Sequence, residues 1–133
     1  EASGNLDQVS QINRLTPKSF HVYSGDDSLT LPMLSVGAVG VVSVASHLVG
    51  DRLQQMIKAF VSGQVTQAAD IHLALFPLFK AQISETSPIH LKVALAIQGW
   101  DIGNCRLPLC EPSPELQQQM KAVLSDMDLL KKQ

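Results

Sequence analysis

The sequence predicts a parallel α/β fold in which a β-α-β unit is followed by a run of helices. Two short segments rich in β-branched or aromatic residues, 20–23 and 41–44, are separated by a helical segment, and the second is nearly all apolar, as in a strand covered on both faces. The 133 residues are 45% hydrophobic and 17% charged, which favours a packed core over disorder. Because two parallel strands alone would leave two unpaired edges, we expect a C-terminal piece of a larger α/β protein. An unusual small α/β domain is the alternative.

The first helix is predicted by its apolar period and its ends. Asn5 can cap it, and Pro17 ends it at Thr16, because proline disfavours helix in the residue before it. The strand at residues 20–23 follows. The apolar positions of the helix are Leu6, Val9, Ile12 and Leu15.

The second helix is predicted to begin at a turn. Gly25 permits the turn, an aspartate after it can cap the helix, and Gly37 ends the helix after Val36. The strand at residues 41–44 then completes the β-α-β unit.

The rest of the chain is predicted to be helical. One helix runs from Ser46 to Gly63, and a second reaches about Ser84. Ser87-Pro88 and Ser113-Pro114 each read as an N-cap followed by a proline in the first helical position. The last helix carries a stripe of apolar residues that can pack either in the core of the same molecule or against a partner helix. The stripe consists of Leu116, Met120, Val123, Met127 and Leu130.

Composition excludes several classes of protein. Ten Lys and Arg against twelve Asp and Glu give a formal net charge of −2, so no positive excess is available for nucleic acid binding. Polar residues, proline and glycine interrupt the most apolar run, residues 31–50, so no membrane helix is predicted. Two cysteines, Cys105 and Cys110, do not make a zinc site or a disulfide framework, and we expect free thiols in a reducing cytosol.

Candidate site residues lie where the predicted strands end, because functional loops of parallel α/β folds follow the carboxyl ends of strands. Gly25, Asp26 and Asp27 follow the first strand. They suit either a plain turn and helix cap or a loop that a ligand approaches at the glycine. Val42, on the second strand, offers its backbone carbonyl. His47 begins the next helix, but no carboxylate partner is evident, and a solvated position is expected.

No nucleophile or metal site follows from the residues themselves. A Schiff-base enzyme needs a desolvated lysine, and none of the lysines here qualifies, since Lys18 precedes its strand and the others fall on helices or the tail. His21, His72 and His90 are isolated and lack ligand spacing, so no metal is predicted.

Four segments resemble the C-terminal half of the 4-hydroxy-tetrahydrodipicolinate synthase (dihydrodipicolinate synthase) family. The resemblance spans essentially the whole chain, and the order and spacing of the segments match. Related families on the same barrel, such as N-acetylneuraminate lyase, resemble the chain less at residues 25–27 and 42–44. The four segments are Glu-Ala-Ser-Gly-Asn-Leu at 1–6, Tyr-Ser-Gly-Asp-Asp at 23–27, Gly-Ala-Val-Gly-Val-Val-Ser-Val-Ala-Ser-His at 37–47, and Arg-Leu-Pro-Leu at 106–109.

The resemblance implies a fold in two parts. Residues 1–62 would form the last two βα units of a (β/α)8 TIM barrel, and residues 63–133 a C-terminal helical domain. The N-terminal half of the same barrel would be the missing partner. Members of the family are commonly cytoplasmic homotetramers, built as dimers of dimers.

The resemblance also implies a chemistry. The family condenses pyruvate with aspartate semialdehyde through a lysine Schiff base, without a separate cofactor or metal, in lysine biosynthesis. That lysine would directly precede Glu1, so the chain alone would be inactive. Val42 would contact pyruvate through its carbonyl, and Gly25, Asp26 and Asp27 would line the side of the second substrate. The alternatives are an N-acetylneuraminate lyase-like enzyme and a non-enzymatic helical interaction fragment.

Overall fold

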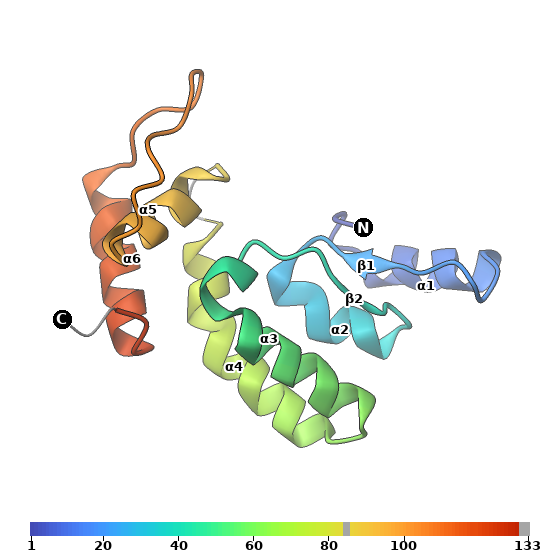
Figure 1. The fold of residues 1–133 in the computed structure, drawn as a ribbon. Helices are drawn as coiled ribbons and strands as arrows, with labels where there is room; N and C mark the ends of the chain where they lie inside the picture. The colour runs from blue at the N-terminus through green and yellow to red at the C-terminus, as the bar shows by residue number, and fades with distance from the viewer. Residues whose placement is uncertain (84–85, 131–133) are drawn as a thin grey trace. The chain divides into compact units, whose positions relative to one another are not determined.

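The computed structural model describes residues 1–83 and 86–130, which divide into two compact units, residues 1–75 and 76–133. The first contains a small parallel sheet and its helices, and the second is helical (Figure 1). This helical α/β content agrees with the coarse fold class predicted from the sequence. The domain boundary predicted at residue 63 stays a prediction.

Helix α1, Leu6–Leu15, has the bounds that the sequence predicts. Asn5 Oδ1 accepts hydrogen bonds from the amides of Asp7 and Gln8 at 3.0 and 3.2 Å, which satisfies donors that the first turn leaves free. The helix ends at Thr16 in an extended conformation, as its position before Pro17 requires.

Strands β1, Tyr23–Ser24, and β2, Gly40–Val41, pair in parallel with Tyr23 opposite Gly40. Both strands were predicted, but their bounds differ from residues 20–23 and 41–44. Phe20 is held in a turn by its amide, which donates to Pro17 O at 2.8 Å. At the other end, the Val44 amide donates to a side chain rather than to the ladder.

The segment between the strands is a 3-10 turn, η1 (Asp27–Leu29), followed by α2 (Thr30–Ser35), so the predicted helix forms in two pieces. Gly37 adopts φ +99°, where glycine is favoured, and ends the helix as predicted. One face of the sheet packs on α1 and α2 through the buried side chains of Val9, Val22, Met33 and Ala38.

The opposite face of the sheet is open among the described residues. Tyr23 is 48% exposed and Val42 is 74% exposed. Large apolar side chains are rarely left together in water without a covering element. The sheet therefore has a covered face toward α1 and α2 and an uncovered face that carries Tyr23.

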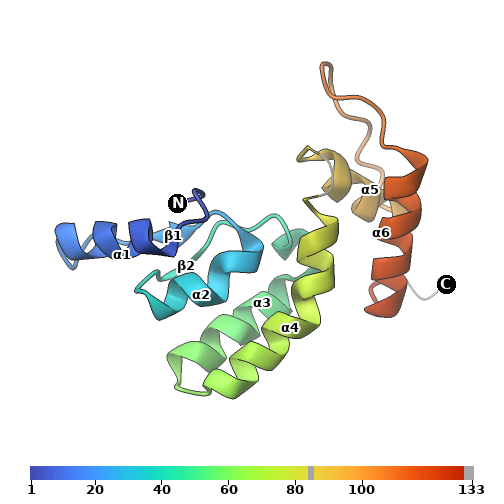
Figure 2. The same ribbon diagram turned by 180° about the vertical axis from the view of Figure 1, so that it is seen from behind.

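Helices α3, Ser46–Val61, and α4, Val65–Ala81, follow β2. Figures 1 and 2 show α3 and the first turns of α4 side by side, joined by a tight turn at Gly63, which has φ +80°. Helix α4 ends at Ala81, short of the predicted Ser84, which lies outside the described residues.

In the second unit, α5 (Ile89–Ile97) packs against α6 (Pro114–Asp126). Ser113 caps α6 as predicted, because its Oγ accepts from the Leu116 amide at 3.1 Å. The equivalent prediction for Ser87 was wrong: Pro88 itself occupies the N-cap position, with φ −99° and ψ 19° and no side-chain cap bond.

The stripe on the last helix is mainly core. Leu116, Met120 and Leu124 are buried, whereas the predicted Val123 and Met127 are only partly buried, since α6 ends at Asp126 and its buried positions recur every four residues. The intramolecular interpretation therefore accounts for this stripe without a partner helix. None of the helices within residues 1–83 and 86–130 is long and apolar enough to cross a membrane.

Candidate active site

Glu1 extends the sheet beside β1. Its nitrogen donates to Tyr23 O at 2.8 Å, and its carbonyl accepts from the Gly25 amide at 2.6 Å. These two bonds are the pattern of a parallel ladder with Glu1 opposite Ser24. On the other edge, the Val39 amide donates to Val22 O, just before β1, and the Val42 amide donates to Ser24 O. The order across the sheet is therefore Glu1, β1, β2, and the edge of β1 expected to be unpaired is covered in part.

Gly25 lies where the backbone of residues 1–2 passes closest to the loop after β1. A Cβ at this position would stand 3.1 Å from both Ala2 Cβ and Glu1 O. A side chain at this position would require Ala2 or the Glu1 carbonyl to move by a few tenths of an ångström. Close packing of the strand ends therefore favours the glycine identified in the sequence.

Asp26 is a cap, one of the two interpretations that the sequence left open. Its Oδ1 accepts from the amide and the hydroxyl of Ser28, each at 2.8 Å, at the start of η1. Ser24 Oγ donates to Asp26 O at 2.8 Å, and this hydrogen bond stabilises the turn. The Asp26 carboxylate therefore accepts its hydrogen bonds from within its own loop.

Asp27 joins the loops that follow the two strands. Its Oδ2 accepts from the amides of Val44 and Ala45 at 3.1 and 2.8 Å, at the entry to α3. A carboxylate is favoured there, because the first amides of a helix lack partners inside the helix. The second oxygen, Oδ1, is buried and has no hydrogen-bond partner among the described residues.

We expect Asp27→Ala to lower the free energy of unfolding of the full-length protein by about 2 kcal/mol, because two charge-assisted hydrogen bonds are lost. Asp27→Asn keeps an acceptor oxygen and should lose less than half as much. Urea denaturation measures both. Asp7→Ala, on the exposed first turn of α1, is the matched control and should stay within about 0.5 kcal/mol of the parent. Equal losses for Ala and Asn would contradict a hydrogen-bonding role for Asp27.

Val42 lies directly after β2, rather than within the strand as the sequence predicted, and on the side of the uncovered face of the sheet. Its amide donates to Ser24 O at 2.8 Å, while no described residue donates a hydrogen bond to its carbonyl. Val42 lines an open cavity of about 490 Å³, whose other walls are Glu1, Ile12 and residues 20–25. The predicted site residues Val42 and Gly25 therefore share one cavity, and Asp26 and Asp27 do not line it.

Several residues that line the cavity were not predicted as site residues, among them Tyr23 and Glu1. Tyr23 is paired with Gly40 and stands on the same face of the sheet, and its ring would lie 3.3 Å from a Cβ at Gly40. The missing side chain at Gly40 thus makes room for the ring, a signal present in the sequence as a glycine within a strand.

The Glu1 carboxylate is held in its ionised form. Hydrogen bonding with Ser3, whose amide donates to Oε1 at 2.6 Å, lowers the pKa of Glu1. The side chain is thereby turned toward its own loop. Glu1 contributes its backbone to the sheet and a negative charge beside the cavity.

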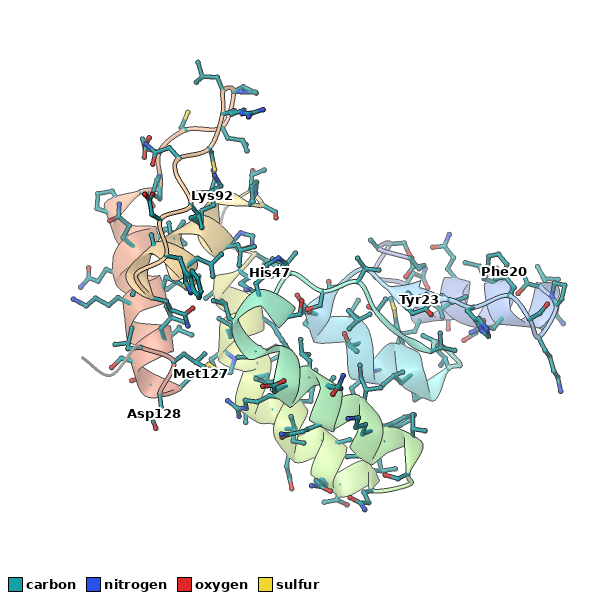
Figure 3. All side chains as sticks on the ribbon, viewed as in Figure 1. Phe20, Tyr23, His47, Lys92, Met127 and Asp128 are labelled. Atoms are coloured by element: carbon teal, nitrogen blue, oxygen red, sulfur yellow. The ribbon has the colours of Figure 1, made fainter. Side chains whose placement is uncertain are left out.

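His47 lies at the start of the helix that follows β2. His47 is exposed at the start of α3, with Nδ1 3.2 Å from Val44 O, as the sequence led us to expect (Figure 3). Across residues 1–83 and 86–130, no group of three or more His, Cys, Asp or Glu side chains is placed to hold a metal ion. Burial lowers the pKa of His72, which disfavours its charged form.

These features define a class of protein: paired parallel strands with an open cavity alongside β1, and with caps and glycines packed at the strand ends. In α/β proteins of this class, ligands bind at the carboxyl ends of the strands, which are here followed by Gly25 and Val42. The comparisons with known proteins agree. The model of the Dihydrodipicolinate synthetase family matches residues 1–127, and the chain belongs to that family.

Relatives match the chain closely over part of their length. The 4-hydroxy-tetrahydrodipicolinate synthase of Nostoc sp. is 61% identical over 130 residues, which are 98% of this chain and 44% of that protein. The enzyme of the same name from Acaryochloris marina is 62% identical, with the same coverage. The chain thus spans less than half the length of these relatives.

Solved structures match the whole fold of the chain. Dihydrodipicolinate synthase from Cyanidioschyzon merolae, with lysine bound, gives a TM-score of 0.95 at 46% identity and covers 98% of this chain and 44% of its own. The Aquifex aeolicus enzyme gives 0.95 at 41% identity and covers 100% and 45%. The resemblance seen in the sequence is therefore confirmed as family membership.

Proposed function

We propose that the chain is the C-terminal part of a cytoplasmic 4-hydroxy-tetrahydrodipicolinate synthase that condenses pyruvate with aspartate semialdehyde. In this proposal, residues 1–62 are the last two βα units of a (β/α)8 barrel, and residues 63–133 are its C-terminal helical domain. The N-terminal half of the barrel covers the open face of the sheet, and the assembled protein is a homotetramer. The names and high identities of the relatives support this assignment.

The register of Glu1 carries the proposal. Glu1 is opposite Ser24, and side chains alternate along a strand, so a residue directly before Glu1 would share a face with Tyr23. This is the face of Gly40 and Val42, and Tyr23 and Val42 on it line the cavity. We propose that this residue is the Schiff-base lysine, whose amine would form an imine with the keto carbon of pyruvate and release water.

Burial in the closed barrel would favour the neutral form of the lysine amine, which is the form that attacks pyruvate. Removing an ammonium group from water disfavours its charged form and leaves a larger fraction of neutral, nucleophilic amine. Tyr23 and Val42 would supply much of the apolar wall. The Val42 carbonyl, which has no donor among the described residues, would face the bound pyruvate, and Gly25 would border the second substrate.

Asp26 and Asp27 act indirectly in this proposal. Asp27 fixes the loop that follows Val42, and Asp26 fixes the turn that follows Gly25. Their part in substrate binding is to hold the cavity walls in place rather than to contact the substrates. No resident cofactor or metal is required.

The test is substrate selection by the full-length protein. Purified protein supplied with pyruvate should consume aspartate semialdehyde at least about a hundred times more efficiently, by kcat/KM, than N-acetylmannosamine. The second aldehyde is the acceptor that an N-acetylneuraminate lyase-like enzyme would use. A preference for N-acetylmannosamine would establish that alternative, and no turnover of pyruvate with either aldehyde would favour the non-enzymatic one.

A further inference from the structure

The segment between α5 and α6 forms a two-armed loop, here called the 98–113 loop. It leaves the end of α5, extends away from both helices and returns to the start of α6 (Figures 1 and 2). Its tip is a closed turn, because the Leu109 amide donates to Arg106 O at 3.1 Å. A bond of this kind brings the two ends of a four-residue turn close together.

The first arm is fixed to α5 by Lys92. Its ammonium group donates to three successive carbonyls, those of Ile102, Gly103 and Asn104, at 3.2, 3.2 and 2.8 Å (Figure 3). Three donors meeting three acceptors satisfy the ammonium fully. The backbone that leads into Cys105 is therefore held at a fixed place on α5.

The second arm is fixed to α6. Ser113 caps the helix, and Gln117 Nε2 donates to Pro112 O at 3.4 Å. The backbone that follows Cys110 is thus also held, two residues beyond the cysteine. Both arms are anchored at the base and joined at the tip.

Cys105 and Cys110 lie on opposite arms, each directly outside the closed turn. The ends of the turn, Arg106 and Leu109, have Cα atoms within about 7 Å of each other, and a disulfide joins residues whose Cα atoms are about 4.4 to 6.8 Å apart. The Cys110 thiol donates to Pro108 O at 3.8 Å, inside the turn. Both cysteines are free, and both line the same cavity of about 370 Å³ beside α5. Cys110 is exposed and Cys105 is partly buried.

We propose that Cys105 and Cys110 form a reversible disulfide that closes the tip of the 98–113 loop, and that the pair exchanges with low-molecular-weight disulfides such as oxidised glutathione. The exposed Cys110 thiolate attacks one sulfur of glutathione disulfide. This forms a mixed disulfide between Cys110 and one glutathione and releases the other glutathione as a thiolate. The Cys105 thiolate then displaces the second glutathione. Two protein thiols are oxidised, one glutathione disulfide is reduced, and the two thiol protons pass to the released glutathione.

The sequence makes the disulfide simple to detect. Trypsin cleaves after Lys92, Arg106 and Lys121, so Cys105 falls in the peptide 93–106 and Cys110 in the peptide 107–121. An intramolecular disulfide joins these two peptides, and reduction separates them. A mixed disulfide with glutathione leaves the peptides separate and adds mass to one of them.

The experiment equilibrates the full-length protein with reduced and oxidised glutathione, traps remaining thiols with N-ethylmaleimide at low pH, and maps the tryptic peptides by mass. The same equilibration in concentrated urea measures the pair in the unfolded chain. We expect the joined peptides in the native protein, at an effective thiol concentration at least about tenfold higher than in urea. Cys105→Ser should convert the product into glutathionylated Cys110, since the second thiol is then absent.

Two results would overturn the proposal. One is native protein that yields only glutathionylated Cys110, with no joined peptides at any redox ratio. The other is an effective concentration no higher in the native protein than in urea, which would mean that the fold does not bring the thiols together. Lys92→Met supplies a second variant: releasing the first arm should lower the effective concentration severalfold while both cysteines remain.

Discussion

Gly25→Val is expected to reduce kcat/KM of the full-length protein by at least about a hundredfold and to lower its free energy of unfolding by about 3 kcal/mol. The Cβ of the new side chain would stand 3.1 Å from Ala2 Cβ and from Glu1 O, and its methyl groups would add further clashes. Because Glu1 O is a backbone atom of the ladder, relief of this clash is expected to move the Glu1 strand end away from β1. That movement would displace the residue before Glu1, which is the proposed nucleophile.

Gly50→Ala is the matched control for Gly25→Val. Gly50 lies in α3, directly after a kink at Val49 (φ −136°, ψ 30°), and a Cβ there would be 3.8 Å from Ser46 Cβ, an ordinary contact. Alanine should leave the activity unchanged and keep the stability within about 1 kcal/mol of the parent. Steady-state kinetics and urea denaturation measure both variants. Normal activity in Gly25→Val would show that the contact with residues 1–2 does not position the site.

Replacing the residue before Glu1 by alanine is expected to have the largest effect of all. If that residue is the Schiff-base lysine, kcat should fall by at least about 10⁴-fold, because no other group of the site can form the imine. The fold should persist, since the change removes a side chain and leaves the backbone ladder with β1. The rate of condensation and the circular dichroism spectrum together separate loss of chemistry from loss of structure.

Lys18→Ala is the control for the alanine replacement. Lys18 is exposed in the turn before β1 and should be replaceable with less than a twofold change in kcat. A full-length protein that lacks a lysine before Glu1, or that keeps its activity without it, would contradict the assigned nucleophile.

The helices near the N-terminus could be predicted well because their signals are local. Asn5, the apolar period and Pro17 together fix both ends of α1, and Gly37 fixes the end of α2. Each of these signals acts within a few residues of its element. Their physical causes, capping and restricted backbone conformations, do not depend on the rest of the fold.

The strand ends could not be predicted, because contacts between distant residues decide them. The Asp27 carboxylate accepts hydrogen bonds from the amides of Val44 and Ala45. These bonds withdraw the two amides from the ladder, so β2 ends earlier than the run of β-branched residues suggests. Glu1 pairs beside Ser24, a register that nothing in the local sequence reveals. For the same reason, the cap formed by Asp26 was among the interpretations of the local sequence, but the bonds from Asp27 to the amides of Val44 and Ala45 could not be predicted.

The most direct test of the central claim is to trap the imine. Full-length protein is incubated with pyruvate and sodium borohydride, which reduces an imine to a stable secondary amine, and the modified peptide is located by mass mapping. The account predicts one stoichiometric adduct on the residue directly before Glu1 and none without pyruvate. A stoichiometric adduct on Lys18, Lys92 or any other lysine of the chain would contradict it.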